Sequence, residues 1–218
     1  MKKNTKNKRV LSEYKVLFKN KNYKKSLLFG IFLLILGGII SSITIWYSDF
    51  VVGNSVTDLI LDNIPTINLL WFRAYGTFFI ALSILAFGIL KPKFLPFLTK
   101  SVGLMYVVRA LFIPLTHLKF YPEKVAVATQ YSFFKIIPYG GNDLFFSGHV
   151  ALPFMAALVF WENKKIRIFC LIATIISGIV VLVSKSHYSI DVFAAPFITY
   201  SIFKISEKFF KKDLEDTK

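Results

Sequence analysis

The sequence predicts an all-α protein embedded in a membrane, with six transmembrane helices in one bundle. Three observations lead to this prediction: an apolar composition, six apolar runs, and basic residues that collect on alternate connections between the runs. Hydrophobic residues make up 55% of the 218 residues, and 24 of them are Phe; the mean hydropathy is +0.59. A soluble domain is about 45–50% apolar, so lipid must cover much of the surface of this chain.

The first run follows a strongly basic segment. Residues 1–26 carry ten Lys or Arg residues and one acidic residue, and the run Ser26–Tyr47 is almost wholly apolar. A secretory signal has a shorter apolar core and a small-residue cleavage site. A run of about 20 residues can instead cross a hydrocarbon layer of about 30 Å. We therefore expect a retained first span behind a basic N-terminal segment.

Five further apolar runs follow, and each predicts a helix because backbone groups in lipid must satisfy one another locally. We expect the prolines inside three of them, Pro114, Pro153 and Pro196, to kink the helices rather than end them. The predicted organisation is a basic segment (1–26), a six-span domain (27–206) and a charged tail (207–218). The five runs are Leu69–Leu90, Ser101–Leu118, Phe146–Trp161, Ile166–Ser184 and Tyr188–Ile205.

The charges on the connections predict the orientation of the bundle. The first connection, residues 48–68, contains three Asp residues and no Lys or Arg, whereas the second and fourth connections and the tail are rich in Lys. Basic segments stay on the cytoplasmic side, so both termini are predicted to be cytoplasmic, in what we expect to be the cell membrane. The third connection is mixed. The net charge of +15 therefore reports topology, and no nucleic-acid partner is expected.

Three ionisable residues are predicted to meet at the extracytoplasmic face. His149 begins the fourth span, His187 ends the fifth, and Asp191 lies one turn into the sixth. Ionisable residues inside a membrane protein usually mark a functional site. His187 and Asp191 are spaced i, i+4 and can share a helical face. A carboxylate can then orient one imidazole as a nucleophile for phosphorus, while the second imidazole protonates the leaving group.

Two motifs carry a resemblance to a known family. Ser147-Gly148-His149 and His187-x-x-x-Asp191 resemble the paired motifs of the phosphatidic acid phosphatase type 2 superfamily. The segment 141–150 is similar to the Gly-Asp-x-x-Phe-Ser-Gly-His-Thr motif of its sphingomyelin synthase branch, with one extra residue and Val for Thr. Residues 187–192 are similar to the branch's His-Tyr-Thr-Ile-Asp-Val. Weaker similarities lie at 58–62 and at Tyr106-x-x-Arg109.

The resemblance implies a membrane enzyme that moves a phospho-head group between lipids through a phosphohistidine, with no metal ion or organic cofactor. Its substrates would be a phospholipid and a lipid alcohol such as ceramide. The phosphatase branch has an Arg six residues before its second histidine, where this chain has Val181, and an Arg-Pro dipeptide, which this chain lacks. These departures favour the transferase. A lipid phosphate phosphatase using the same residues stays open, as does a non-catalytic membrane protein, and no oligomeric state is predicted.

The phosphate charge needs a cation. Arg73 lies near the outer end of the second span, and Arg109 lies midway along the third, where an Arg is costly unless it faces the bundle interior. Lys185 is expected to flank a span and His117 to be structural. The candidate residues are His149, His187 and Asp191 for catalysis, and Ser147, Gly148, Asp143, Tyr106, Arg109 and Arg73 for substrate binding.

Overall fold

The computed structural model describes residues 2–51, 53–124 and 143–217, and within them it contains helices and no strand. The predicted all-α class is therefore confirmed for this part of the chain. Three short 3-10 turns join the helices: η1 (Leu61–Asn63), η2 (Pro92–Phe94) and η3 (Ile113–Leu115). The helices are α1 (Lys2–Leu17), α2 (Lys21–Phe50), α3 (Leu70–Leu90), α4 (Leu95–Phe112), α5 (Gly148–Val159), α6 (Lys164–Val183), α7 (Ser189–Phe209) and α8 (Lys211–Glu215).

Helices lie at all six predicted positions, but only four are long and apolar enough to cross a membrane. Within the described residues these are α2, α3, the segment Pro92–Leu115 that contains α4, and α6. Helix α5 has 12 residues, and at 1.5 Å per residue it is about 18 Å long, short of the ~30 Å hydrocarbon layer. Helix α7 is long enough but carries Asp191 in its first turn and Lys208 in its last. The prediction of six spans is thus not confirmed as such.

Prolines behave differently in the three helices that were predicted to contain them. Pro153 lies inside α5 and Pro196 inside α7, and both helices continue past them as predicted. Near Pro114 the α-helix ends, where a kink was predicted: α4 stops at Phe112 and the chain continues as η3. A proline has no N–H for the helical hydrogen bond and clashes with the preceding turn, which accounts for this tightening.

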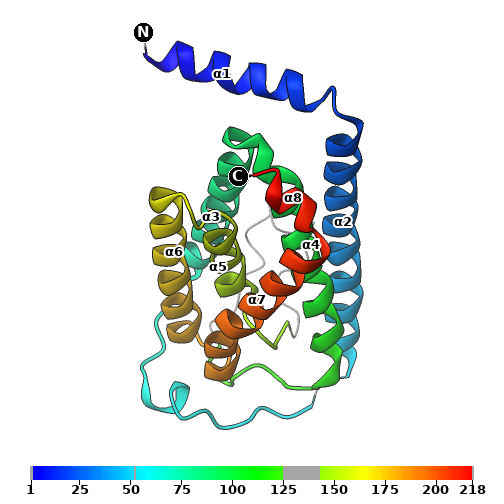
Figure 1. Cartoon of the computed structure of the whole chain (residues 1–218). Coiled ribbons are helices and arrows are strands. Elements are labelled where there is room, and N and C mark those ends of the chain that lie inside the picture. The colour runs from blue at the N-terminus through cyan, green and yellow to red at the C-terminus, as the bar shows by residue number, and fades with distance from the viewer. Residues whose placement is uncertain (1, 52, 125–142, 218) are drawn as a thin grey trace.

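The helices form one bundle around α5 (Figure 1). Helix α2 packs along α4, while α5 packs on α6 and α7, and α3 packs against α6 and α5. Glycines allow α2 and α4 to approach closely: a Cβ added to Gly103 would lie 2.7 Å from Leu33 Cβ, and one added to Gly37 would lie 2.9 Å from Tyr106 Cβ. Small residues serve this purpose at helix contacts in membranes.

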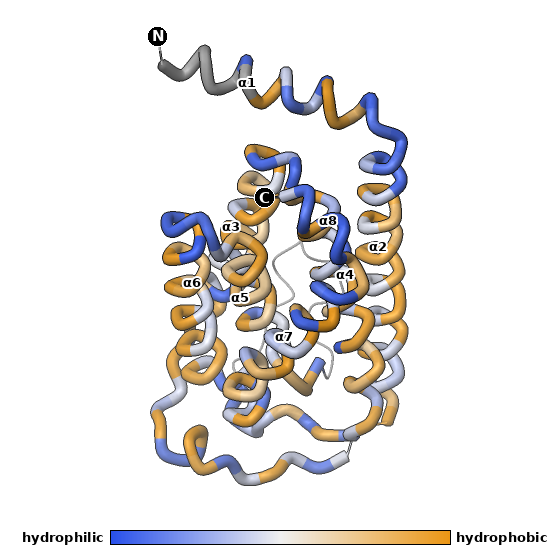
Figure 2. Tube along the Cα trace, viewed as in Figure 1, coloured by the Kyte–Doolittle hydropathy of each residue, from blue (hydrophilic) through white to orange (hydrophobic). Residues whose placement is uncertain are grey.

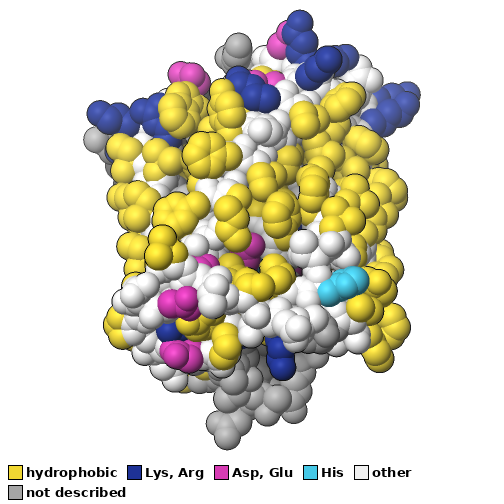
Figure 3. Space-filling model, turned by 90° about the horizontal axis from the view of Figure 1, so that it is seen from below, with side chains coloured by type: hydrophobic (Ala, Val, Ile, Leu, Met, Phe, Trp, Pro, Cys, Tyr) yellow, Lys and Arg dark blue, Asp and Glu magenta, His cyan; other side chains and the backbone are white. Residues whose placement is uncertain are grey.

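The outer surfaces of the helices are apolar, as lipid contact requires. Figure 2 shows long hydrophobic stretches along α2, α3 and α6, with hydrophilic residues mainly at the helix ends and on α1. Figure 3 shows apolar side chains over a broad area of the surface, with cationic side chains gathered along its upper edge. The exposed side chains include Phe32, Ile39, Phe79, Leu82 and Ile175, each at least half exposed. Such an area is far larger than a soluble monomer exposes.

Both chain termini lie at one end of the bundle, and α1 crosses this end beside α2 (Figure 1). The termini are fastened there by Lys100 of α4, whose ammonium lies 2.6 Å from Asp213 of α8 and 2.6 Å from Ser26 Oγ of α2. The segment 53–69 crosses the opposite end, where Ile67 N donates to Val183 O at 2.8 Å. The start of α7 lies at this second end, which we call the outer end of the bundle.

Candidate active site

The end of α6 places His187. Lys185 has φ = 49° and follows the last helical turn, where Lys185 N donates to Leu182 O and Ser186 N donates to Val181 O at 3.0 Å. These two bonds form a Schellman motif, which ends a helix through a residue in the left-handed region, commonly Gly. The chain therefore turns sharply between α6 and α7, and His187 lies buried at 4% exposure on the connection.

Asp191 orients His187 from the first turn of α7. Its Oδ2 lies 3.3 Å from His187 Nδ1 and accepts a hydrogen bond from Tyr188 N at 3.3 Å. Asp191 is only 2% exposed. Because a carboxylate accepts at Nδ1, the proton of a neutral ring belongs on that nitrogen, and Nε2 keeps its lone pair. The two residues are thus paired, but not on a shared helical face as predicted, because His187 lies before the first residue of α7.

His149 arrives from a different helix. Ser147 N donates to the Asp191 carbonyl at 2.9 Å, so the segment before α5 is tied to the first turn of α7. The rings of His149 and His187 lie 5.9 Å apart, at an interplanar angle of 71°. His149 Nε2 and Ser147 Oγ are buried, and neither has a hydrogen-bond partner among the described residues. A buried polar atom without a partner is costly, so a ligand at this position would satisfy the imidazole.

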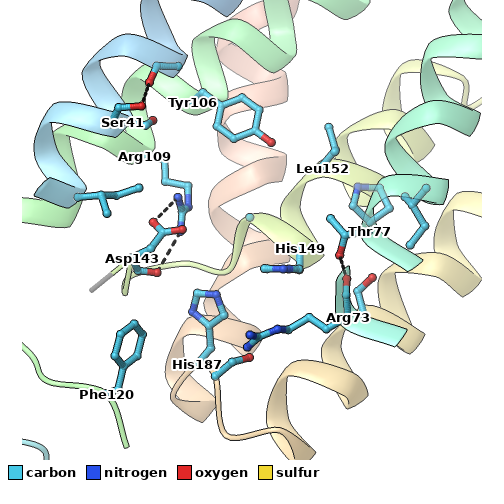
Figure 4. A pocket seen from close by; sticks show the side chains of 18 of the residues that line it. Ser41, Arg73, Thr77, Tyr106, Arg109, Phe120, Asp143, His149, Leu152 and His187 are labelled. Carbon is cyan, nitrogen blue, oxygen red and sulfur yellow. Dashed lines mark hydrogen bonds and ion pairs between the residues drawn. The ribbon is translucent and has the colours of Figure 1, made fainter. Parts of the chain in front are cut away.

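The two histidines line a cavity of about 440 Å³ that extends between α2, α3, α4 and α5. Both apolar and polar side chains line it, and several of the polar ones lie beside the histidines. Figure 4 shows Arg73 pointing toward His187 and His149, with Arg109 and Asp143 on the other side of His187. Its apolar residues include Leu34, Ile45, Ile80 and Leu152; its polar ones include Ser41, Arg73, Tyr106, Arg109, Lys124, Asp143, His149 and His187.

Arg109 holds the turn that precedes α5. Its Nη1 lies 2.7 Å from Asp143 Oδ1, and its Nε donates to Phe146 O at 2.9 Å. Between these partners Phe145 has φ = 88°, a conformation that costs a non-glycine residue about 1–3 kcal/mol. The guanidinium thus faces the bundle interior, as predicted from its cost in lipid, and it stabilises a strained turn as well as lining the cavity.

The other predicted residues divide between the cavity and its surroundings. Arg73, Tyr106, Asp143 and Gly148 line the cavity. Lys185 does not: its ammonium lies 2.6 Å from Glu123 Oε2. His117 lies outside the cavity, with its ring 6.0 Å from that of Tyr47.

The sequence-based site did not include Lys124, which lines the cavity, or Asp58, which lies beside the start of α7. The Asp58 carboxylate accepts hydrogen bonds from Ser189 N at 2.7 Å and from Ile60 N and Leu61 N. Burial raises the pKa of Asp58, but these N–H groups outweigh it and hold the pKa below its ordinary value. Asp58 thereby fastens segment 53–69 to the first residue of α7. The only sequence signal was its weak motif similarity, which says nothing of the partner.

Comparison with known proteins finds one similarity, in the C-terminal part of the chain. Residues 140–208 match the family model of the PAP2 superfamily C-terminal domain, and the match contains both histidine motifs and Asp191. No curated protein and no solved structure matches the chain. The match covers less than half of the 218 residues, and it makes this part of the chain similar to a superfamily of phosphatases and phosphotransferases. The apolar helices fit a membrane protein. The match does not select the sphingomyelin synthase-like branch.

Proposed function

We propose that the chain is a lipid phosphotransferase that moves a phospho-head group from a phospholipid to a lipid alcohol through a phosphohistidine. One observation carries the proposal: the rings of His149 and His187 lie 5.9 Å apart beside one cavity, and among the described residues His187 has a carboxylate partner while His149 has none. Two imidazoles in unequal environments suit the two unequal roles of nucleophile and general acid.

The reaction has two displacements. Nε2 of His187 attacks phosphorus, the bond from phosphorus to the diacylglycerol oxygen breaks, and protonated His149 gives its proton to that oxygen. Asp191 stabilises the positive charge that develops on the His187 ring. In the second displacement His149 accepts the proton of an acceptor hydroxyl, whose oxygen attacks the phosphohistidine and releases His187. Protons and bonds balance over the two steps, and no metal ion takes part.

We assign the residues around the two histidines to the binding of the phosphate and of the rest of the substrate. Arg73 is buried at 5% exposure and points toward both rings (Figure 4), so we assign it to the phosphate oxygens. The N–H groups of Gly148 and His149 at the start of α5 are further donors for an anion. We assign Tyr106 and Asp143, which line the opposite side, to substrate binding, and Ser147 to the support of the turn.

The cavity walls suit a lipid. Its lining combines Leu34 and Ile45 of α2 with Ile80 of α3 and Leu152 of α5. A Cβ on Gly38 of α2, which also lines the cavity, would meet no atom within 4 Å. A volume of about 440 Å³ is too small for two acyl chains, so the chains of a bound phospholipid would continue between the helices into the bilayer.

A lipid phosphate phosphatase is the second candidate, and the charge of the cavity favours it. Arg73 and Lys124 line the same cavity as the two histidines, so cations are present although the motifs of the phosphatase branch are not. A phosphate monoester carries more negative charge than a diester and benefits more from them. In this case water would attack the phosphohistidine in the second displacement.

The test uses the purified full-length chain in lipid nanodiscs. Phosphatidic acid, phosphatidylcholine and phosphatidylethanolamine, each labelled at phosphorus, are supplied with and without ceramide, and the products are separated by chromatography. A labelled ceramide product supports the transferase, whereas labelled inorganic phosphate from phosphatidic acid supports the phosphatase. The matched control is His187→Ala. If the wild-type protein and this variant give the same products with every substrate, neither enzyme is correct.

A further inference from the structure

A short turn on the outer end of the bundle holds an ammonium group in the cavity. The turn Tyr121–Lys124 is closed by a hydrogen bond from Lys124 N to Tyr121 O at 2.9 Å, with Pro122 in its second position. Proline favours that position because its ring fixes φ near −65°. Lys124 lines the cavity together with Arg73 and His187. The turn therefore reaches the candidate active site from the loop that precedes the undescribed residues.

The side chains on either side of Lys124 fix the turn to its neighbours. Tyr121 Oη donates to Asp62 Oδ1 at 2.6 Å. Glu123 Oε2 accepts from Thr66 Oγ1 at 2.6 Å and from Lys185 Nζ at 2.6 Å. The bonds to Asp62 and Thr66 tie the turn to segment 53–69, and the bond to Lys185 ties it to the residue two places before His187. The turn is thus held in register with the histidine that we propose as the nucleophile.

The ammonium of Lys124 lacks an acidic partner. Within the part of the chain that the structure describes, no carboxylate lies within 4.0 Å of its Nζ. The ring of Phe120 lies beneath it. Arg73 of α3 adds a like charge, and the carboxylates of Asp143 before α5 and Asp49 of α2 act on it in the opposite sense. A desolvated cation without an anion is unfavourable, and the described lining of the cavity combines Lys124, Arg73, Arg109 and two histidines with one carboxylate, that of Asp143. A phosphate group bound beside Lys124 would compensate its charge.

We propose that Lys124 is a phosphate-binding residue that contacts the non-bridging oxygens of the phospho-group while His187 attacks it. This inference rests on the proposed function, because it assigns a role in the same site. Lys124 would work with Arg73, on opposite sides of the phosphate. This role also explains why the side chains of Tyr121 and Glu123 fix the turn to its neighbours, since a flexible lysine binds poorly unless its backbone is held in place.

Lys124 makes phosphate binding depend on pH. Burial and, next, the nearby Arg73 lower the pKa of Lys124 to about 7, against the weaker opposing effects of Asp143 and Asp49. The lysine is charged below this pKa and neutral above it. Its contribution to kcat/KM, which reports the free enzyme, is therefore present at pH 6 and lost as the pH rises through about 7 toward 9. Arginine stays charged throughout this range.

The experiment compares four proteins on dioctanoyl phosphatidic acid and dioctanoyl phosphatidylethanolamine between pH 6 and pH 9. They are the wild type, Lys124→Met, Lys124→Arg and the control Lys119→Met, which removes an exposed lysine from the same loop. Ratios of kcat/KM to wild type cancel the pH effects that all four proteins share. Lys124→Met should lose about ten- to a hundredfold at pH 6, the worth of a charged hydrogen bond, and little at pH 9. Lys124→Arg should retain most activity at pH 6 and exceed the wild type at pH 9.

The failure of this proposal can be told apart from failure of the proposed function. If Lys124→Met matches Lys119→Met at pH 6 while the wild type is active, Lys124 does not bind the phosphate. If Lys124→Met does not fold, a Lys124→Arg profile that falls with pH in parallel with the wild type leads to the same conclusion. If the wild type is inactive, the stabilisation of each protein by inorganic phosphate is measured by its thermal unfolding. Loss of this stabilisation in Lys124→Met at pH 6, but not in Lys119→Met, supports the proposal; equal stabilisation rejects it.

Discussion

At the scale of single residues, the two histidines differ in what surrounds them. His187 has Asp191 at Nδ1, whereas Nε2 of His149 is buried without a partner among the described residues. A nucleophile is indispensable for the covalent step, but a proton donor matters only when the leaving group is a poor one. The asymmetry therefore predicts different responses to removal of each ring.

His187→Ala should abolish the phosphoenzyme, and His149→Ala should lower turnover of a natural lipid by about 10²–10⁴-fold. A nitrophenyl phosphodiester hardly needs a proton on its leaving oxygen, so it should restore activity to His149→Ala and leave His187→Ala inactive. The measurements are phosphohistidine trapping and nitrophenol release. Rescue of His187→Ala in place of His149→Ala would reverse the two roles.

Arg109 is the residue whose loss should affect stability and activity together. Its guanidinium binds Asp143 and the Phe146 carbonyl, and the turn between them contains Phe145 at φ = 88°. Arg109→Gln should lower the free energy of unfolding by about 1–3 kcal/mol, because buried acceptors lose charged donors, and it should misplace His149. Melting temperature and initial rate are measured on the same preparations, with Arg167→Gln, on an exposed hydrogen bond, as control. An unchanged melting temperature with lost activity would instead point to direct phosphate binding by Arg109.

At the scale of the elements, the start of α7 depends on a carboxylate from another segment. Asp58 accepts from Ser189 N, so it caps α7 from outside the helix, and a cap is worth about 0.5–2 kcal/mol. The pKa of Asp58 is lowered in the folded protein by its backbone hydrogen bonds, which outweigh burial. A depressed pKa stabilises the fold above the ordinary carboxyl pKa of about 3.9, and this stabilisation is lost as the pH falls through the lower folded value.

Asp58→Asn should therefore lower the melting temperature at pH 7, and the difference from wild type should shrink as the pH is reduced below about 4. Thermal unfolding in detergent over this pH range measures the effect. Asp216→Asn, at an exposed position on the tail, corrects for general charge effects. A difference that stays constant with pH would mean that the ionised carboxylate does not hold the start of α7.

The positions of the helices could be predicted from the sequence, but most of the contacts between them could not. Apolar runs sufficed to predict six helices. The pair of His187 and Asp191 was predicted from a shared helical face, but it forms between the connection and the first turn of α7. The shortness of α5 was missed because the preceding residues, which continue the apolar run at Phe146, turn back toward Arg109 and are held by it. Lys124 was missed for a related reason: its position depends on Glu123 and Tyr121 reaching residues about 60 positions away. Such long-range polar contacts leave no periodic pattern.

At the scale of the whole molecule, the chain is fastened at both ends of the bundle. Asp58 and the turn at Tyr121–Lys124 close the outer end, and Lys100, Ser26 and Asp213 close the end that holds the termini. The Lys100 side chain is only 10% exposed, and Asp213 of the tail supplies its counter-charge. The contact of Lys100 with Ser26 and Asp213 lies at the end of the bundle opposite the histidines. Its loss should therefore lower stability without changing the chemistry of the site.

Asp213→Leu should destabilise the fold by up to about 3 kcal/mol, because it leaves a buried ammonium unpaired. Lys100→Met in the same chain should recover most of the loss, since two apolar residues can replace a buried ion pair. Turnover measured well below the melting temperature should be unchanged in both variants. A melting temperature that does not fall in Asp213→Leu, or that falls further in the double variant, would show that the ion pair is not what holds the tail.

The orientation of the whole bundle in the membrane follows from charge. Figure 1 shows the termini at one end of the bundle and the start of α7, which follows His187, toward the other. The basic connections share the end of the termini, so the site should face the extracytoplasmic side. In a Cys170→Ser background, which removes the single, buried cysteine, Leu59→Cys places a thiol on segment 53–69 at a position that is 85% exposed. It should react with an impermeant thiol reagent in intact cells. Lys93→Cys, exposed near η2 at the other end, should react only after the membrane is permeabilised. The reverse pattern would place the two histidines, and hence the lipid head groups that they act on, at the cytoplasmic face.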